Sequence, residues 1–189
     1  MEPAQANEYA GLRQTGCEAA NDFVRAEYEG LYRWFLWLTR DPERAADLTQ
    51  ETCASFFHSI RRTVPETTPR VWLYAIGRNV WRKHCRKRQR QRKEESDVVL
   101  DELGEESPSP HYKVELHEFA QALTGVVALL EPPYREVFTL RVWQELDYED
   151  IAAIQGISRD LARWRFFKAR QLVRAQLDSW QRQEEHHGS

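Results

Sequence analysis

The sequence predicts an all-α protein made of two small helical domains joined by an acidic linker. Apolar residues recur at three- and four-residue spacing on both sides of the linker, and no convincing strand-like alternation is present. Eight Lys or Arg residues fall within 82–93, seven acids and no base follow within 94–106, and Ser-Pro-Ser-Pro stands at 107–110. A basic run, an acidic run and Pro/Ser punctuation in succession indicate a solvated boundary between domains.

This boundary divides the chain into five expected segments. The segments are an N-terminal extension (1–20), a first helical domain (21–91), the acidic linker (92–112), a second helical domain (113–180) and a tail (181–189). We assign no function to the His-rich tail.

The first domain is expected to hold three helices. Apolar and aromatic residues within 23–38 lie on one face of the first helix. The segment Asp41-Pro42-Glu43 predicts the start of the second, because Asp caps helices, Pro suits the first helical position and Glu suits the positive end of the dipole. Pro65 and Pro69 end that helix. A third helix is expected to start near Arg70, with the basic run 82–93 as its distal half.

The second domain is predicted to contain a helix-turn-helix. An amphipathic segment spans 116–130, Pro132-Pro133 interrupts it, and helix resumes over 134–144. Asp147 then caps a short helix through Ile154, Gly156 supplies a left-handed turn residue, and Ser158 caps a longer basic helix. This order is typical of a helix-turn-helix whose second helix lies in the major groove of DNA.

Composition excludes several classes of protein. No stretch approaches 18 uncharged apolar residues and no signal peptide is visible, so we expect a cytoplasmic protein that does not enter a membrane. Three cysteines are too few for a disulfide framework, and His84-Cys85 lacks metal-ligand spacing. No Gly-rich phosphate loop and no catalytic constellation stand out, so we expect no metal, no cofactor and no enzymatic activity. A net charge of −3 argues against a uniformly basic nucleic-acid binder, although the charges are segregated.

Three segments together carry a family pattern. Residues 47–51 read Asp-Leu-Thr-Gln-Glu, residues 72–79 read Trp-Leu-Tyr-Ala-Ile-Gly-Arg-Asn, and 130–170 contain the helix-turn-helix. In this order, across a charged linker, they resemble the extracytoplasmic-function (ECF) sigma factors of bacterial RNA polymerase. The resemblance covers residues 21–177 and implies a promoter-specificity subunit rather than an enzyme.

The resemblance implies two partners, core RNA polymerase and promoter DNA. The first domain would bind the β′ coiled coil of the polymerase and hold the melted −10 strand, and the second domain would meet the β flap and the −35 element. A protein that binds a melted strand needs Arg and Lys side chains to contact the backbone and aromatic rings on which the bases can stack. The alternative is that the aromatic residues of this chain belong to the hydrophobic core. The implied polymerase contacts are Asp47, Leu48, Gln50 and Glu51. The implied −10 contacts are Arg61, Arg62, Arg70, Trp72, Tyr74, Arg78, Asn79 and Arg82. The implied −35 contacts are Arg159, Arg163, Trp164, Arg165, Phe167 and Lys168.

One departure from the family pattern suggests a mode of control. Family members usually carry Asp-Ala-Glu-Asp where this chain has Arg44-Ala45-Ala46-Asp47, so two acids are missing from the surface that would meet the polymerase. Thr63 follows two arginines, a context that many basic-directed Ser/Thr kinases favour, and a phosphate there would add negative charge. Thr49 and Thr52 are rival acceptors, and Thr63 is alternatively an ordinary loop residue. An anti-sigma partner is the commoner control in the family.

A stand-alone transcriptional regulator is the alternative interpretation. In it, 112–177 would read duplex DNA and 21–91 would form a dimerisation or partner domain. Both interpretations predict salt-sensitive DNA binding. A repressor dimer binds a palindrome by itself, whereas a sigma factor needs core polymerase and reads two unlike elements.

Overall fold

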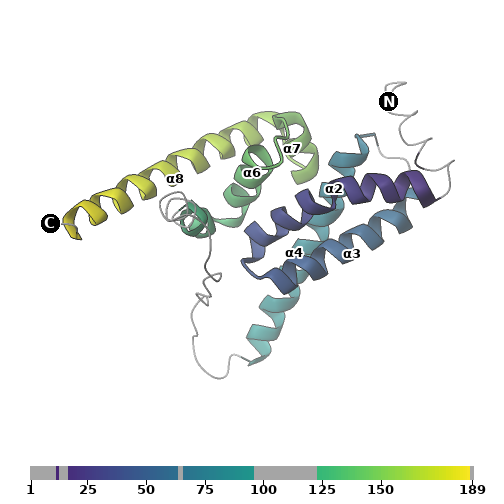
Figure 1. Ribbon diagram of the computed structural model, residues 1–189, viewed down its shortest axis with the longest axis horizontal. Coiled ribbons are helices and arrows are strands. Elements are labelled where there is room, and N and C mark those ends of the chain that lie inside the picture. Colours follow the sequence, from purple (N-terminus) through teal and green to yellow (C-terminus); the bar gives the residue numbers. More distant parts are fainter. Residues whose placement is uncertain (1–11, 13–16, 64–65, 96–122, 188–189) are drawn as a thin grey trace. The chain divides into compact units, whose positions relative to one another are not determined.

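The computed structural model describes residue 12 and residues 17–63, 66–95 and 123–187, and the ordered elements in these ranges are helices (Figure 1). No strand occurs in the described ranges, in agreement with the all-α prediction. The chain divides into two compact units, one built mainly on the helices before the linker and one built on those after it. Each unit is described by itself. The predicted linker lies outside the described residues from 96 onward, as do positions 64–65, between the predicted −10 contacts Arg62 and Arg70, and most of the N-terminal extension.

The first unit is a three-helix bundle of α2 (Cys17–Thr39), α3 (Pro42–Ile60) and α4 (Pro69–Glu95). Helix α3 packs against both of the other helices. The ring of Phe56 connects them, because its centroid lies 5.4 Å from that of Phe23 on α2 and 5.3 Å from that of Trp72 on α4. The largest fully buried side chains of this core are Leu31, Trp34, Phe35, Leu48, Phe56, Val71, Leu73 and Tyr74.

Gly77 sets the close approach of α4 to α2. A Cβ atom at this position would lie 3.2 Å from ring atoms of both Trp34 and Phe35. Because those rings are fully buried, they have little room to move aside. Glycine is therefore required here by packing and not by its backbone conformation.

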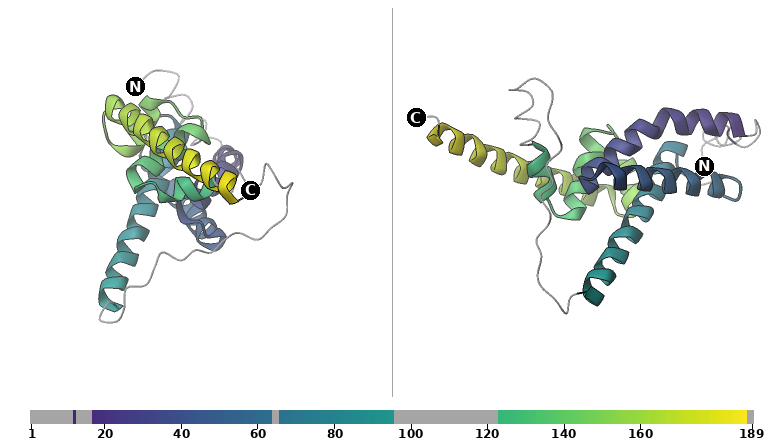
Figure 2. Two further views of the ribbon diagram at one scale, coloured as in Figure 1. Left: turned by 90° about the vertical axis from the view of Figure 1, so that its left-hand side faces the viewer. Right: turned by 60° about the horizontal axis from the view of Figure 1, so that its bottom comes forward.

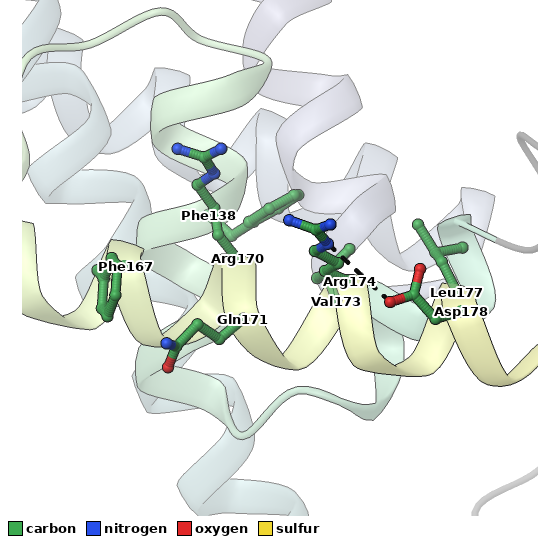
Figure 3. Close-up of a pocket in the computed structure, with 8 residues that line it drawn as sticks. All are labelled: Phe138, Phe167, Arg170, Gln171, Val173, Arg174, Leu177 and Asp178. Carbon is green, nitrogen blue, oxygen red and sulfur yellow. Dashed lines mark ion pairs between the residues drawn. The ribbon is translucent and has the colours of Figure 1, made fainter.

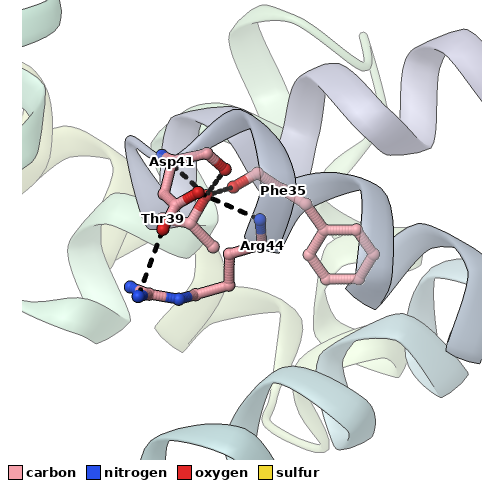
Figure 4. Close-up of polar contacts among 4 residues, drawn as sticks. All are labelled: Phe35, Thr39, Asp41 and Arg44. Atoms are coloured by element: carbon pink, nitrogen blue, oxygen red, sulfur yellow. Dashed lines mark hydrogen bonds and ion pairs between the residues drawn. The ribbon is translucent and has the colours of Figure 1, made fainter.

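A short turn joins α2 to α3 (Figure 4). Arg40 adopts a left-handed conformation with φ 57°, which ends α2. The Thr39 hydroxyl donates to the Phe35 carbonyl at 2.9 Å and accepts from the Asp41 backbone N–H at 3.2 Å. Asp41 then caps α3, its carboxylate accepting from the Arg44 backbone N–H at 3.0 Å. The helix start predicted at Asp41-Pro42 is confirmed.

The second unit contains helical residues 123–129, α6 (Pro132–Val142), α7 (Tyr148–Gln155) and α8 (Arg159–His187). Helix α6 packs against α8. Its guanidinium-bearing Arg135 donates at 3.0 Å to the carbonyl of Leu130, which ties the start of α6 to the preceding helical segment. The most buried apolar residues of this unit include Val127, Val137, Leu140, Ile151, Ala162 and Ala169.

Several helices extend beyond the limits expected from the sequence. Helix α2 begins at Cys17, before the expected domain start, and α4 continues to Glu95, into the expected linker. Helix α6 starts at Pro132 itself, since the first turn of a helix needs no backbone N–H donors. Helix α8 continues to His187, through most of the segment expected to be a tail.

Candidate nucleic-acid interface

The helix-turn-helix has the geometry that its sequence predicts. The Asp147 carboxylate accepts from the backbone N–H groups of Glu149 and Asp150, both at 2.8 Å, and so caps α7. Gly156 adopts φ 64°, the left-handed conformation expected between the two helices. The Ser158 hydroxyl accepts from the backbone N–H of Leu161 at 3.2 Å and caps α8. All three sequence signals are confirmed.

Helix α8 has a narrow buried stripe and a broad exposed face. The stripe consists of small residues, Ala162, Ala169 and Val173, which let α8 approach the rest of the unit. Trp164 and Phe167 lie away from this stripe with 51% and 57% of their surfaces exposed. The Trp164 ring is held beside Tyr134 of α6, with 6.2 Å between ring centroids. Of the other predicted −35 residues, Arg159, Arg163 and Lys168 are exposed and Arg165 is half-buried.

A groove of about 580 Å³ lies beside this face, between α8 and Phe138 of α6 (Figure 3). Arg174 and Asp178 form an ion pair at 4.0 Å on its rim. Phe167 and Gln171 line it as well, so the exposed face of α8 continues past Lys168. The sequence interpretation did not assign Gln171, although its spacing of seven residues from Trp164 places both on the same side of a helix.

The predicted polymerase contacts on α3 divide into exposed and buried residues. Asp47, Gln50 and Glu51 are exposed, and Glu51 forms an ion pair with Lys83 of α4 at 3.3 Å. Leu48 is only 2% exposed and belongs to the bundle core. Its assignment as a contact was wrong, because the inward face of α3 carries it between α2 and α4.

Arg44 changes the charge at the start of α3. Its guanidinium pairs with the Asp41 carboxylate at 3.1 Å (Figure 4), so one acid of this surface is already neutralised within the helix. Burial lowers the pKa of the nearby His84, and the positive charges of Arg44 and Arg88 lower it further, while Glu51 opposes them. This end of the α3–α4 surface is therefore more positive than the family pattern implies.

The predicted −10 residues lie on the end of α3 and along α4. Arg61, Arg62, Asn79 and Arg82 are exposed, and Arg78 is half-buried. Arg70 pairs with Glu27 of α2 at 3.1 Å and lies 5.9 Å from the centre of the Tyr74 ring.

The two aromatic residues proposed for stacking are not equivalent. Trp72 is half-buried, and its ring contacts Phe56 in the core. Tyr74 is fully buried beside Trp34, at 5.4 Å between ring centroids, and burial raises the pKa of its hydroxyl well above the usual value. Its assignment as a DNA contact was wrong, because the core of the bundle takes up the whole ring.

The candidate phosphate acceptors differ in accessibility. Thr63 is exposed just after the end of α3, where its backbone N–H donates to the Ser59 carbonyl at 3.0 Å. Thr49 and Thr52 are fully buried, and their hydroxyls donate at 2.7 Å to the carbonyls of Ala45 and Leu48. A kinase cannot reach either of them in the folded unit, so Thr63 is the accessible acceptor of the three.

The described residues contain no group of His, Cys, Asp and Glu side chains arranged to hold a metal ion. In the same ranges, no helix is long and apolar enough to cross a membrane.

Family models match most of each helical unit. The model described as Sigma-70 region 2 matches residues 23–91, and the model described as Sigma-70, region 4 matches residues 120–173. The sequence is 30% identical over 145 residues to the ECF RNA polymerase sigma factor SigM of Bacillus subtilis, which covers 77% of this chain and 86% of that protein. It is also 30% identical to the ECF sigma factor SigE of Mycolicibacterium smegmatis, over 86% of this chain and 65% of that protein.

Solved structures share the fold. The sigma factor RpoE of Bartonella quintana, crystallised with the anti-sigma factor NepR, aligns with a TM-score of 0.68 and 25% identity, over 83% of this chain and 97% of that chain. The structure of CnrH in complex with the cytosolic domain of CnrY aligns with a TM-score of 0.69 and 19% identity, over 94% of this chain and 99% of that chain. The second likeness concerns the fold alone.

Proposed function

The chain belongs to the extracytoplasmic-function family of RNA polymerase sigma factors, and from this premise we propose how its two units act in transcription initiation. The first unit binds core polymerase and the melted −10 strand, and the second unit reads the −35 element as duplex DNA. The family membership favours this function over that of a stand-alone regulator, which needs no polymerase-binding unit.

The exposed face of α8 is the observation that carries the proposal for the second unit. A capped helix-turn-helix presents Arg163, Trp164, Phe167 and Lys168 to solvent, and none of these side chains is needed for the core. Basic side chains bind phosphates and donate hydrogen bonds to the guanine edge, while apolar side chains contact thymine methyl groups in the major groove. The face thus combines attraction to the backbone with groups that distinguish bases.

The proposal for the −10 strand rests on the basic residues around the α3–α4 connection. Arg61, Arg62, Asn79 and Arg82 are accessible to a nucleic-acid backbone and base edges. With Tyr74 in the core, Trp72 is the one aromatic residue of the proposed set with exposed ring surface. Unstacked bases gain free energy from stacking on such a ring.

The proposal for polymerase binding rests on the exposed polar side of α3. Asp47, Gln50 and Glu51 lie there, and acids suit a basic coiled coil such as that of β′. The basic Arg44 and the internal pairs that Asp41 and Glu51 make reduce the negative charge of this surface. We therefore expect weak binding to core polymerase unless further negative charge is supplied.

Phosphorylation of Thr63 is the proposed source of that charge. The Thr63 hydroxyl oxygen would attack the γ-phosphorus of ATP, releasing ADP and the hydroxyl proton, and the product would carry about −1.5 to −2 charge. Helix geometry separates Arg44 from Thr63 by more than about 20 Å, which exceeds two screening lengths at physiological salt. The phosphate would therefore act by contacting the partner at the far end of α3 and not by neutralising Arg44.

Co-purification with bacterial core RNA polymerase tests the function and the switch together. Wild-type, Thr63→Glu and Thr63→Ala proteins are compared at equal concentration. Retention of the Glu variant alone supports both proposals, whereas equal retention of all three supports the sigma function and contradicts the switch. If no variant and no kinase-treated wild-type protein is retained, the polymerase-binding proposal is wrong.

An anti-sigma factor is the second proposed mode of control. The Bartonella relative was crystallised with such a partner. A partner of this kind would cover DNA- or polymerase-binding surfaces of this chain as well, and it would act in the cytoplasm, where RNA polymerase is found.

A further inference from the structure

Tyr134 of α6 lies beside Trp164, a tryptophan on the exposed face of α8. Helix α6 packs against α8 (Figures 1 and 2), and the two ring centroids are 6.2 Å apart with an interplanar angle of 56°. Trp164 still exposes 51% of its surface, whereas Tyr134 is half-buried. The pair therefore joins an exposed residue of the helix-turn-helix to a residue outside the predicted set of −35 contacts.

The backbone that carries Tyr134 is well fixed. Pro132-Pro133 opens α6, and proline holds φ near the helical value in the first turn. The backbone N–H of Tyr134 donates to the Glu131 carbonyl at 3.0 Å, and the middle of α6 is buried in the unit. The Tyr134 ring thus has a fixed point of attachment, from which it limits the positions open to the Trp164 indole.

The exposed half of the indole is an apolar surface on a face that also carries basic residues. Arg163 and Lys168 are exposed on the same helix. Contacts of basic side chains with phosphates add affinity but carry no sequence information, which comes from groups that reach the base edges. In the major groove, the apolar group that identifies a base is the C5-methyl of thymine. The Trp164 indole is therefore suited to contact thymine.

Contact with Tyr134 increases the affinity that such a contact can provide. A side chain that becomes ordered only on binding loses conformational freedom, which weakens binding by about two- to tenfold. Aromatic rings at the separation of Tyr134 and Trp164 attract each other beyond the effect of burial alone. The indole has thus lost part of its freedom before DNA arrives.

We propose that Tyr134 is a positioning residue that holds the Trp164 indole against the C5-methyl group of a thymine, so that this chain selects thymine at one position of the −35 element. The inference rests on the proposed function, in which the second unit reads the −35 element as duplex DNA. It adds a residue outside the helix-turn-helix and the identity of one base.

The test first measures the base preference of the full chain. Wild-type protein is incubated with a pool of duplexes that have a randomised centre, and the bound duplexes are sequenced. Each thymine of the selected duplex is then replaced by deoxyuracil, which lacks only the methyl group, and affinity is measured by fluorescence anisotropy. One replacement should weaken wild-type binding by about fourfold, the value of one buried methyl group. Trp164→Ala should abolish this difference.

Variants of Tyr134 separate positioning from folding. Tyr134→Ala should bring the affinity ratio of the thymine duplex to the deoxyuracil duplex close to one, whereas Tyr134→Phe keeps the ring and should keep the ratio. The effects of Tyr134→Ala and Trp164→Ala should not add in the double variant, because both residues act through one contact. A Tyr134→Ala variant that keeps the wild-type ratio would overturn the positioning role.

The matched control is Trp143→Ala. Trp143 belongs to the same unit, is half-buried like Tyr134, and its ring lies 5.6 Å from that of the core residue Phe138. Its replacement should lower the thermal midpoint and leave the ratio unchanged. An equal fall of the ratio in the control and in Tyr134→Ala would make the effect one of stability, and the proposal would be wrong.

The outcomes also separate this inference from the proposed function. If the wild-type chain selects no sequence, the −35 proposal for the second unit is wrong, and this inference with it. If it selects a sequence but no deoxyuracil replacement weakens binding, the −35 proposal stands and the thymine contact is wrong. Selection of guanine at the position that depends on Trp164 would also overturn the thymine contact, because the indole N–H would then be the group that reads the base.

Discussion

Gly156 lies in the turn between α7 and α8 with φ 64°, and no atom lies within 4 Å of the position its Cβ would take. Space therefore does not demand glycine here, but the backbone conformation does. The opposite holds for Gly77, where neighbouring rings fill the space. A glycine can therefore be required either by its backbone conformation or by the lack of space for a side chain, and only the structure distinguishes the two reasons.

A Gly156→Ala substitution should lower the free energy of unfolding of the second unit by about 1–2 kcal/mol, the cost of a left-handed conformation for a residue with a Cβ. Gly125 is the control, since it lies in helical residues 123–129, also has open space, and has no positive φ. Gly125→Ala should leave stability unchanged or raise it by up to about 1 kcal/mol. Urea denaturation followed by circular dichroism measures both, and equal effects of the two substitutions would contradict the assignment.

His84 should make the stability of the first unit depend on pH. Its Nε2 atom is buried without a hydrogen-bond partner in the part of the chain that the structure describes, and its pKa is lowered by burial and by Arg44 and Arg88. Below about pH 6.5 the unfolded chain binds a proton that the folded unit resists, so the free energy of unfolding falls as pH falls.

Comparison of urea midpoints at pH 7.5 and pH 5.5 checks this expectation. The His84→Gln variant should show a smaller drop in its midpoint than the wild-type protein. The Arg44→Gln variant should also show a smaller drop, since it removes a charge that lowers the His84 pKa. An unchanged drop in the His84→Gln variant would show that other groups cause the pH dependence.

The sequence could not show which members of a motif face inward. Leu48 lies between exposed Asp47 and buried Thr49 in the motif that resembles the family, and Tyr74 lies within the Trp-Leu-Tyr run. Both fit their proposed contacts by residue type. Helix packing places both in the core, and that packing depends on partners far along the chain, such as Trp34 for the Tyr74 ring. Local chemistry carries no such information.

At the scale of whole elements the sequence was more informative. Asp41, Asp147 and Ser158 each cap the helix predicted for them, because capping depends on residues within one turn. The helix boundaries that the sequence did not predict are set by causes other than capping residues. Prolines begin α6 instead of preceding it, and the charged ends of α4 and α8 continue as helix although they lack a regular apolar face.

The cap of α7 gives a prediction at this scale. Asp147→Ala removes the acceptor of two backbone N–H groups and should lower the free energy of unfolding of the second unit by about 1 kcal/mol. Asp147→Asn should restore most of it, because an asparagine carbonyl accepts the same bonds. Urea denaturation measures both. A deficit of equal size in both variants would assign the effect to the lost charge instead of the cap.

At the scale of the whole molecule, a net charge of −3 hides opposite local charges. The exposed basic residues of α4, such as Arg82 and Arg86, and the exposed face of α8 suit DNA, while Asp47 and Gln50 on α3 suit a protein partner. These surfaces lie on different helices, so single substitutions should separate the two activities.

Two substitutions with opposite effects test this separation. In the Thr63→Glu background, Asp47→Lys should weaken retention on core polymerase by tenfold or more, roughly 1.4 kcal/mol, through charge repulsion, and should leave binding to −35 duplex DNA unchanged. Arg163→Ala should weaken binding to the −35 duplex by about 1–3 kcal/mol and leave polymerase retention unchanged. Pull-down assays and anisotropy titrations measure the two activities. Loss of both activities in either variant would contradict the division between the units.

Helix α8 keeps its structural and its outward-facing residues at separate positions. Ala162, Ala169 and Val173 hold the helix in the unit, whereas Trp164 and Phe167 make little contribution to the core. On the proposed function, substitutions on the exposed face would therefore alter promoter preference at almost no cost in stability. Over evolutionary time such a helix can shift from one set of promoters to another by single steps, each of which leaves a folded protein. Gene duplication followed by such steps would let one scaffold serve many regulons.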